Sequence, residues 1–253
     1  CHILVLDTHG VNVWCAAGKG TFSTDELVRK IESSRLKEVV GHRVVILPQL
    51  GASGVSAHEV KKRAHFKVEY GPVRAADLPE YLKTRQATAA MRKVSFTFKE
   101  RMVLAPVELV QHLLPFTAAI LALWLLLGLL AGWAALAAFF ACCVLFPALL
   151  PWLPTRQFSI KGFTLGALTA LPFAALAFTG GQPLWQQAVL ALAFLTGIPA
   201  VTAYIALNFT GATPLTGPTE VAREMRRYIR PMAGLGIISA VGLITLIAVR
   251  FLG

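Results

Sequence analysis

LLPFTAAILALWLLLGLL, residues 113–130, is an uninterrupted apolar run, and four further apolar runs follow it along the chain. The five runs cover about 113–130, 133–149, 163–179, 187–207 and 232–251. Each approaches the roughly 20 residues that a helix needs to cross a hydrocarbon core about 30 Å thick. Five buried helices in succession would leave a soluble core too little polar surface. We therefore predict an all-α transmembrane domain of five helices within residues 106–253.

Charge divides the chain close to the point where these runs begin. The 253 residues are 56% hydrophobic with a formal net charge of +11, yet residues 1–111 hold 17 of the 24 Lys and Arg residues and 11 of the 13 acids. The whole composition is too apolar for an ordinary soluble domain. We expect residues 1–105 to fold in water and the remainder in lipid. Aromatic and basic residues do not alternate in a way that would indicate nucleic-acid binding.

The loops between the apolar runs predict an orientation. Lys and Arg are confined to the second and fourth loops, at Arg156, Lys161, Arg223, Arg226, Arg227 and Arg230. Because cytoplasmic loops carry the excess of Lys and Arg, we predict a multi-pass protein of the cytoplasmic (inner) membrane with its N-terminal domain in the cytoplasm and its C-terminus outside. No ionisable residue interrupts the five runs before Arg250, which disfavours a pump or an ion-coupled carrier.

Residues 2–111 alternate the patterns of strands and helices. Short apolar runs predict strands at 3–6, 44–47 and 66–70, and helices are predicted to begin after Ser23, Ser56 and Asp77. Ser23 with Glu26, and Ser56 with Glu59, have the spacing of capping boxes. Strands separated by helices pair in parallel through right-handed crossovers. We therefore predict an α/β domain with an open, mainly parallel sheet, and we expect it to be incomplete at its N-terminus because the chain starts at the first strand.

Three loops follow these strands at the carboxyl edge of the sheet, where open α/β sheets bind their ligands. The loops are residues 8–22, 48–54 (PQLGASG) and 71–77 (GPVRAAD). They are rich in Gly, Ala and Ser, and small side chains let the backbone approach a broad, flat ligand. None has the spacing of a nucleotide-binding motif.

The first loop contains an isolated cysteine, Cys15, in VNVWCAAGKG (residues 11–20). Most isolated cysteines are buried structural residues. A thiol on a short helix near Lys19 could instead be a reactive nucleophile or sensor. It could also be the single protein ligand of a metal that brings the rest of its coordination sphere. Cys1, Cys142 and Cys143 provide neither a disulfide framework nor the spacing of a metal site.

NVWCAAGKGTFST, residues 12–24, with DTHG before it and DELVRKI after it, resembles the cap-helix motif of the HgcA family, the corrinoid protein of the bacterial and archaeal mercury-methylating pair. The stretches LPQLGASGV, GPVRAADLP, RMVLAPVEL and LNFTGATPLTG also resemble that family, as does a C-terminal domain of five spans. The soluble half is similar to the cobalt-carrying subunit of the corrinoid iron–sulfur protein, which lacks the cap-helix cysteine. His9 and Ser23 stand where other polar or small residues are expected in the HgcA family.

The resemblance implies a membrane-anchored corrinoid methyltransferase that passes a cobalt-bound methyl group to Hg(II) and forms methylmercury. Cys15 would be the lower axial ligand of a cobalamin-type cobalt, on a helix whose small residues lie flat on the macrocycle. The implied cofactor-binding residues are Asn12, Val13, Trp14, Cys15, Ala16, Ala17, Gly18, Lys19, Gln49, Leu50, Gly51, Ala52, Val73, Arg74 and Ala75.

The same resemblance implies partners. A methylated donor of the folate pathway would supply the methyl group, and a ferredoxin-like partner with two 4Fe–4S clusters would supply electrons, because this chain has no cluster ligands. Two alternatives stay open: a membrane-bound corrinoid methyl carrier with a different acceptor, and a non-enzymatic metal-binding module that uses Cys15.

Overall fold

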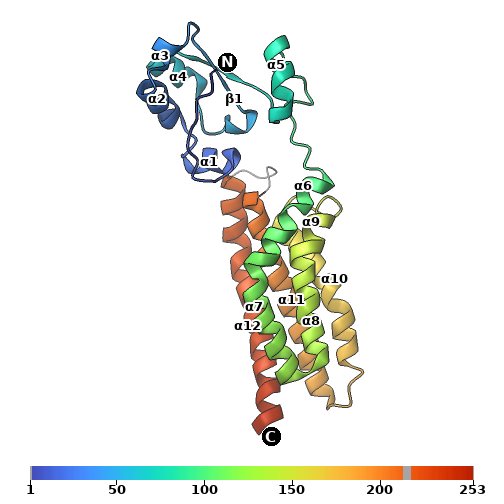
Figure 1. Ribbon diagram of the computed structural model, residues 1–253. Coiled ribbons are helices and arrows are strands. Elements are labelled where there is room, and N and C mark those ends of the chain that lie inside the picture. The colour runs from blue at the N-terminus through green and yellow to red at the C-terminus, as the bar shows by residue number, and fades with distance from the viewer. Residues whose placement is uncertain (1, 213–217, 253) are drawn as a thin grey trace. The chain divides into compact units, whose positions relative to one another are not determined.

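A computed structural model describes residues 2–212 and 218–252, and the chain forms two compact units, residues 1–95 and 96–253 (Figure 1). The boundary between the units lies ahead of position 105, where the change in charge and hydropathy had suggested a division. Part of the stretch LNFTGATPLTG lies outside the described residues.

The first unit has a small parallel sheet among short helices. Its strands are β1 (Val44–Leu47) and β2 (Lys67–Tyr70), paired in parallel with Val44 opposite Lys67 and Leu47 opposite Tyr70. Its helices are α1 (Val13–Lys19), α2 (Thr24–Ser33), α3 (Leu36–Val39), α4 (Ala57–Ala64) and α5 (Leu78–Thr84), and its 3-10 turns are η1 (Gln49–Gly51) and η2 (Ala75–Asp77). Both strands and their parallel pairing confirm the sequence prediction.

The predicted strand at residues 3–6 is wrong, since the sheet of the described residues contains only β1 and β2. Leu4 and Leu6 pack against the core, whereas Ile3 and Val5 are 86% and 66% exposed. An apolar run suggests a strand covered on both faces, but this segment is covered on one face only. The sheet is therefore smaller than the open, doubly wound sheet predicted from the sequence.

One apolar core joins the helices to the strands of this unit. Its buried side chains come from α1, α2, α4, both strands and the loops between them: Ala16, Ala17, Phe22, Leu27, Val28, Ile31, Val40, Leu47, Val55, Val60, Ala64, Phe66 and Val68. The inward residues of α2 recur at the three- and four-residue spacing of an amphipathic helix. This core places α1 beside the ends of the strands.

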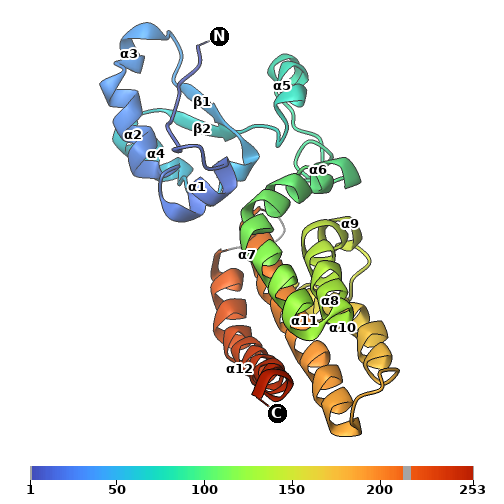
Figure 2. The ribbon, with the colours of Figure 1, turned by 60° about the horizontal axis from the view of Figure 1, so that its bottom comes forward.

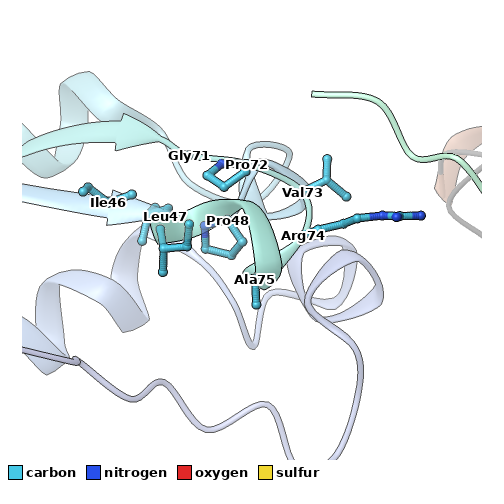
Figure 3. Close-up of a pocket in the computed structure, with 9 residues that line it drawn as sticks. Ile46, Leu47, Pro48, Gly71, Pro72, Val73, Arg74 and Ala75 are labelled. Carbon is cyan, nitrogen blue, oxygen red and sulfur yellow. The ribbon is translucent and has the colours of Figure 1, made fainter. Parts of the chain in front are cut away.

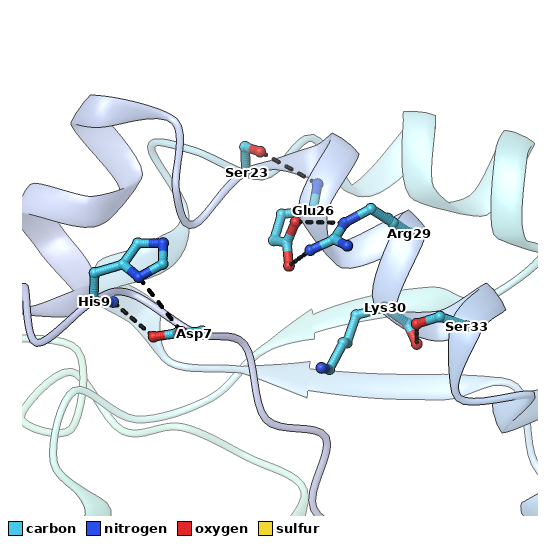
Figure 4. Close-up of polar contacts among 7 residues, drawn as sticks. All are labelled: Asp7, His9, Ser23, Glu26, Arg29, Lys30 and Ser33. Atoms are coloured by element: carbon cyan, nitrogen blue, oxygen red, sulfur yellow. Dashed lines mark hydrogen bonds and ion pairs between the residues drawn. The ribbon is translucent and has the colours of Figure 1, made fainter.

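Ser23 caps α2, as predicted, but its capping box is only half formed. The Glu26 amide donates to Ser23 Oγ over 3.3 Å, whereas the Glu26 carboxylate accepts hydrogen bonds from Arg29 at 2.9 and 2.7 Å (Figure 4). The hydrogen bond from Arg29 holds the pKa of Glu26 below its ordinary value. The Glu26 carboxylate thus pairs with Arg29 within the helix and accepts no hydrogen bond from the backbone N–H of Ser23.

The second predicted capping box is wrong, although α4 begins where expected. Ser56 Oγ lies 2.9 Å from the ring of His58 and makes no capping bond. Asp77 precedes α5 without a side-chain cap. A complete capping box forms instead at Thr97 and Glu100, where sequence reasoning had not placed one.

The second unit is a bundle of long helices that lie alongside one another (Figures 1 and 2). Its elements are α6 (Phe98–Met102), α7 (Leu104–Leu127), α8 (Leu129–Phe140), the π-helical segment η3 (Ala141–Leu145), α9 (Phe146–Leu149), α10 (Phe158–Ala177), α11 (Leu184–Ala212) and α12 (Pro218–Leu252). Five helical stretches are long and apolar enough to cross a membrane: Phe98–Leu127, Leu129–Leu149, Phe158–Ala177, Leu184–Thr210 and Glu220–Leu252. The predicted number of spans is confirmed by length and composition.

Two glycines let α10 approach α11 closely. A Cβ atom added to Gly162 would lie 2.5 Å from Cα of Ala203, and one added to Gly166 would lie 2.5 Å from Cα of Pro199. Gly162 and Gly166 are four residues apart, so they lie on one face of α10. Small residues at this spacing allow the backbones of membrane helices to pack directly.

The helices are longer than the five apolar runs, and ionisable residues lie in the turns that precede the runs in α7 and α10. α7 begins well before the apolar run, so Glu108 and His112 lie within it, and their side chains approach to 3.4 Å between His112 Nδ1 and Glu108 Oε2. In α10, buried Lys161 donates to the carbonyl oxygens of Leu150 and Leu153 at 2.6 and 2.9 Å. Ionisable side chains thus lie within the first turns of α7 and α10, ahead of their apolar runs.

Candidate functional site

A tight turn directs the chain into α1. The Thr8 hydroxyl donates to the Val11 carbonyl over 2.6 Å, and the His9 amide donates to Asp7 Oδ1 over 2.7 Å. His9 and the following Gly10 both have positive φ, of 54° and 75°. The His9 ring also lies 3.4 Å from the Asp7 carboxylate (Figure 4). Asp7 therefore holds a turn that few residues other than glycine adopt readily.

Both ends of α1 are capped. Asn12 Oδ1 accepts a hydrogen bond of 2.8 Å from the amide of Cys15, so Asn12 is the N-cap of this helix. Gly20 ends the helix with φ of 86°, the left-handed conformation usual for glycine at this position. A helix of seven residues has little stability of its own, so these caps and its tertiary contacts determine where Cys15 lies.

Replacing Asn12 by Ala is expected to destabilise the α1 region by about 1 kcal/mol, because the Cys15 amide loses its acceptor. Hydrogen–deuterium exchange of the full chain, read over residues 12–24, would measure the change. Asn12→Asp provides the matched control, since aspartate caps helices as well as asparagine does. Equal protection in Asn12→Ala and wild type would show that the cap does not hold the helix.

The inner face of α1 lies against the loop that follows β1. Ala16 and Ala17 are buried, and a Cβ added to Gly54 would meet Cβ of Ala17 at 2.9 Å and the Phe22 carbonyl oxygen at 2.2 Å. The Phe22 amide also donates to the Ala16 carbonyl over 3.1 Å. The side chains of the two alanines therefore point into the protein, and their contact with a bound ring stays a prediction.

The outer face of α1 carries the cysteine. Asn12, Gly18 and Lys19 are exposed, while Trp14 and Cys15 are half-buried. Gly18 follows Cys15 by three residues and so lies beside it on the helix surface. Val13, also half-buried, packs against the core. The thiol is thus held at the surface of the unit next to a residue that has no side chain.

A small cavity opens at the carboxyl ends of β1 and β2 (Figure 3). Its volume is about 220 Å³, and its lining combines strand ends with the predicted Val73, Arg74 and Ala75: Ile46, Leu47, Pro48, Gly71, Pro72, Val73, Arg74, Ala75 and Leu78. The strand-end residues Ile46, Leu47, Gly71 and Pro72 were not among the predicted site residues. Their place at the ends of predicted parallel strands was the signal that could have identified them.

The other predicted loop, Gln49 to Ala52, forms η1 and its C-cap. Gln49 Oε1 accepts a hydrogen bond from the Arg92 side chain over 3.1 Å, and the backbone N–H of Gln49 donates to the Pro72 carbonyl oxygen over 3.5 Å. η1 contacts α1 directly. Leu50 and Ala52 are half-buried, and Gly51 is buried where an added Cβ would meet the Phe22 ring at 2.5 Å. The structure therefore brings α1 and the loop after β1 together, and the loop after β2 joins them through Pro72.

The charged groups near the cavity are already engaged. Arg74 donates to the Ser95 hydroxyl, and in Figure 3 its side chain extends away from the apolar lining. Within residues 2–212 and 218–252, no three His, Cys, Asp or Glu side chains gather in an arrangement that could hold a metal ion. The first unit therefore offers a half-buried thiol with small residues beside it on α1, and an apolar cavity at the carboxyl ends of its strands.

Comparison with known proteins finds a partial match. No protein-family model matches the chain, and no solved structure matches it. Over 83 residues, a third of this chain, the sequence is 29% identical to the acetyl-CoA decarbonylase/synthase complex subunit gamma of Methanopyrus kandleri. The matched segment spans 18% of that subunit. The chain is therefore similar to part of a subunit from an enzyme complex.

Proposed function

We propose that the first unit binds a corrinoid and that Cys15 is the single protein ligand of its cobalt. The observation that supports this proposal most is the position of Cys15, half-buried on the outer face of a capped helix that packs on the loop after β1. Ligands of parallel α/β sheets bind at this edge. The partial similarity to a subunit of an acetyl-CoA decarbonylase/synthase complex supports an enzymatic setting.

The chemistry of the site fits such a group. Cobalt in a corrin already carries four ring nitrogens, so one soft thiolate from the protein is sufficient. Gly18 leaves space on the helix surface beside Cys15, and Trp14 offers an apolar surface. The cavity of about 220 Å³ is smaller than the roughly 300 Å³ at which ligand pockets usually begin. It would therefore take only a part of a corrinoid, and not the whole group.

We further propose that Hg(II) accepts the transferred group, so that the chain is a corrinoid-dependent methyltransferase that forms methylmercury. When bound, the corrinoid would supply a transferable methyl group. In this reaction the protein would hold the Cys15 thiolate in place, through the Asn12 cap and through the packing of α1 against Gly54. The methyl donor of the folate pathway and the ferredoxin-like electron donor belong to this proposal, as do the cytoplasmic side of the first unit and the external C-terminus.

The first test is the anaerobic ultraviolet–visible spectrum of the full chain reconstituted with cobalamin, with wild type and Cys15→Ala compared. We expect wild type to bind the corrinoid and to show a cobalt–thiolate band that Cys15→Ala lacks. Cys142→Ala is the matched control, because it removes a buried thiol of the second unit and leaves α1 intact. Identical spectra for wild type and Cys15→Ala would show that Cys15 is not a ligand of the cobalt. A folded wild type that binds no corrinoid would overturn the whole proposal.

The acceptor needs a separate assay. Methylated corrinoid protein mixed with Hg(II) should yield methylmercury in wild type, and Cys15→Ala should yield much less. Corrinoid binding without methylmercury would show a methyl carrier with another acceptor.

A further inference from the structure

The last helix is longer than a bilayer requires. α12 contains 35 residues, which at 1.5 Å per residue is about 52 Å, against a hydrocarbon core of about 30 Å. The apolar part of α12 extends from about 232 to its C-terminal end, so the excess lies at its N-terminal end. About 15 residues of α12 would therefore extend past the hydrocarbon into the headgroup layer and beyond.

Contacts with α10 fix the rotation of this N-terminal part. Glu224, which is buried, accepts a hydrogen bond from the amide of Ser159, and the Tyr228 hydroxyl donates to Gln157 Oε1 over 2.6 Å. Glu224 and Tyr228 are one turn apart and define the inner face of the helix. Both contacts join the start of α12 to the start of α10.

The opposite side of this segment carries four exposed arginines, here called the arginine face: Arg223, Arg226, Arg227 and Arg230. At 3.6 residues per turn these positions fall within an arc of about 100°. Of the two acids in the segment, Glu224 points inward, and Glu220 lies one turn before Arg223. The arginine face is thus a concentrated positive surface at the level where a membrane's headgroups would lie.

Its surroundings favour a lipid over a soluble acidic protein. Met225 and Ile229, between the arginines in sequence, are 43% and 38% exposed. Apolar side chains interspersed with basic ones on one helix are typical of the boundary between headgroups and acyl chains. The arginine face also continues directly into an apolar span.

We propose that the arginine face binds the phosphate groups of anionic membrane lipids. The guanidinium group is planar and can donate two parallel hydrogen bonds to one phosphate. Basic residues next to a membrane-spanning helix attract anionic lipids, and each contributes about a fivefold gain in binding. The surface would retain a shell of anionic lipid around α12 and the start of α10.

The test measures lipid binding to the full chain in detergent micelles by native mass spectrometry, with phosphatidylglycerol and phosphatidylcholine of identical acyl chains. We expect wild type to retain phosphatidylglycerol in preference and to lose this preference as salt rises. Replacing all four arginines of the arginine face by Gln should weaken phosphatidylglycerol binding at least about tenfold. The corresponding Lys variant should keep most of it, because the charge remains.

A matched control removes the same charge elsewhere: Lys37, Lys61, Lys62 and Lys83, all exposed in the first unit, are replaced by Gln. This control should bind phosphatidylglycerol like wild type. Circular dichroism confirms that each variant folds. Equal binding by wild type and the Arg-to-Gln variant would overturn the proposal, as would an arginine-dependent capture of acidic protein by wild type that shows no preference for phosphatidylglycerol.

Discussion

Gly54→Ala should lower the free energy of unfolding of the first unit by about 3 kcal/mol, the upper part of the range for overpacked interiors. The added Cβ would lie 2.2 Å from the Phe22 carbonyl oxygen and 2.9 Å from Cα of Ala17. Both of these atoms belong to the backbone, so neither can rotate away from the added Cβ. Helix α1, which carries Cys15, would have to move away from the loop that contains Gly54. Hydrogen–deuterium exchange over residues 12–24 and 49–56 of the full chain would report the loss.

Gly41→Ala is the control for this prediction. Gly41 has no atom within 4 Å of an added Cβ, so the change should have little effect on stability. Because α1 holds Cys15, Gly54→Ala should also bind less corrinoid than Gly41→Ala if the proposed function is correct. Equal exchange protection in the two variants would mean that α1 does not rest on Gly54.

Gly166→Ala should destabilise the helical bundle by about 2 to 3 kcal/mol, although alanine favours a helix over glycine by about 1 kcal/mol. The added Cβ would lie 2.5 Å from Cα of Pro199 and 3.0 Å from the Ile198 carbonyl oxygen. α10 and α11 would then have to separate along their contact. Thermal unfolding of the full chain in detergent, followed by circular dichroism, measures the change.

Gly234→Ala in α12 should change the stability of the bundle in the opposite direction. Gly234 also lies inside a helix, but no atom lies within 4 Å of its added Cβ. Helix propensity then acts alone, and the substitution should raise the melting temperature slightly. If Gly166→Ala were as stable as Gly234→Ala, the close packing of α10 on α11 would not exist in the folded protein.

The elements that the sequence predicted well are those with a strong local pattern. β1 is a short apolar run between turns, and the five long helices are apolar along most of their length, so neither required knowledge of distant contacts. Residues 3–6 show the same local pattern as β1 but have one covered face. Which apolar run becomes a strand depends on partners that hydropathy does not record.

The candidate site divides in the same way. The cap at Asn12 is a local feature, because its side chain reaches an amide only three residues further along the chain. The inward direction of Ala16 and Ala17 is not, since small side chains next to Cys15 suit either a flat ligand or a closely approaching loop, and only the contact with Gly54 decides between them. Glu108 and His112 were placed ahead of the first apolar run and outside the predicted spans, because a hydropathy average does not show that a helix begins before its apolar run.

The carbonyl oxygens at the end of α9 receive their donors from both directions along the chain. Buried Arg101 donates to the Pro147 carbonyl over 3.0 Å, while Lys161 serves Leu150 and Leu153. Arg101 is synthesised before this end and Lys161 after it. During translation, the end of α9 can therefore take its final form only when the start of α10 has left the ribosome. We expect the pairing of α7 with α8 and the docking of α10 to be completed together.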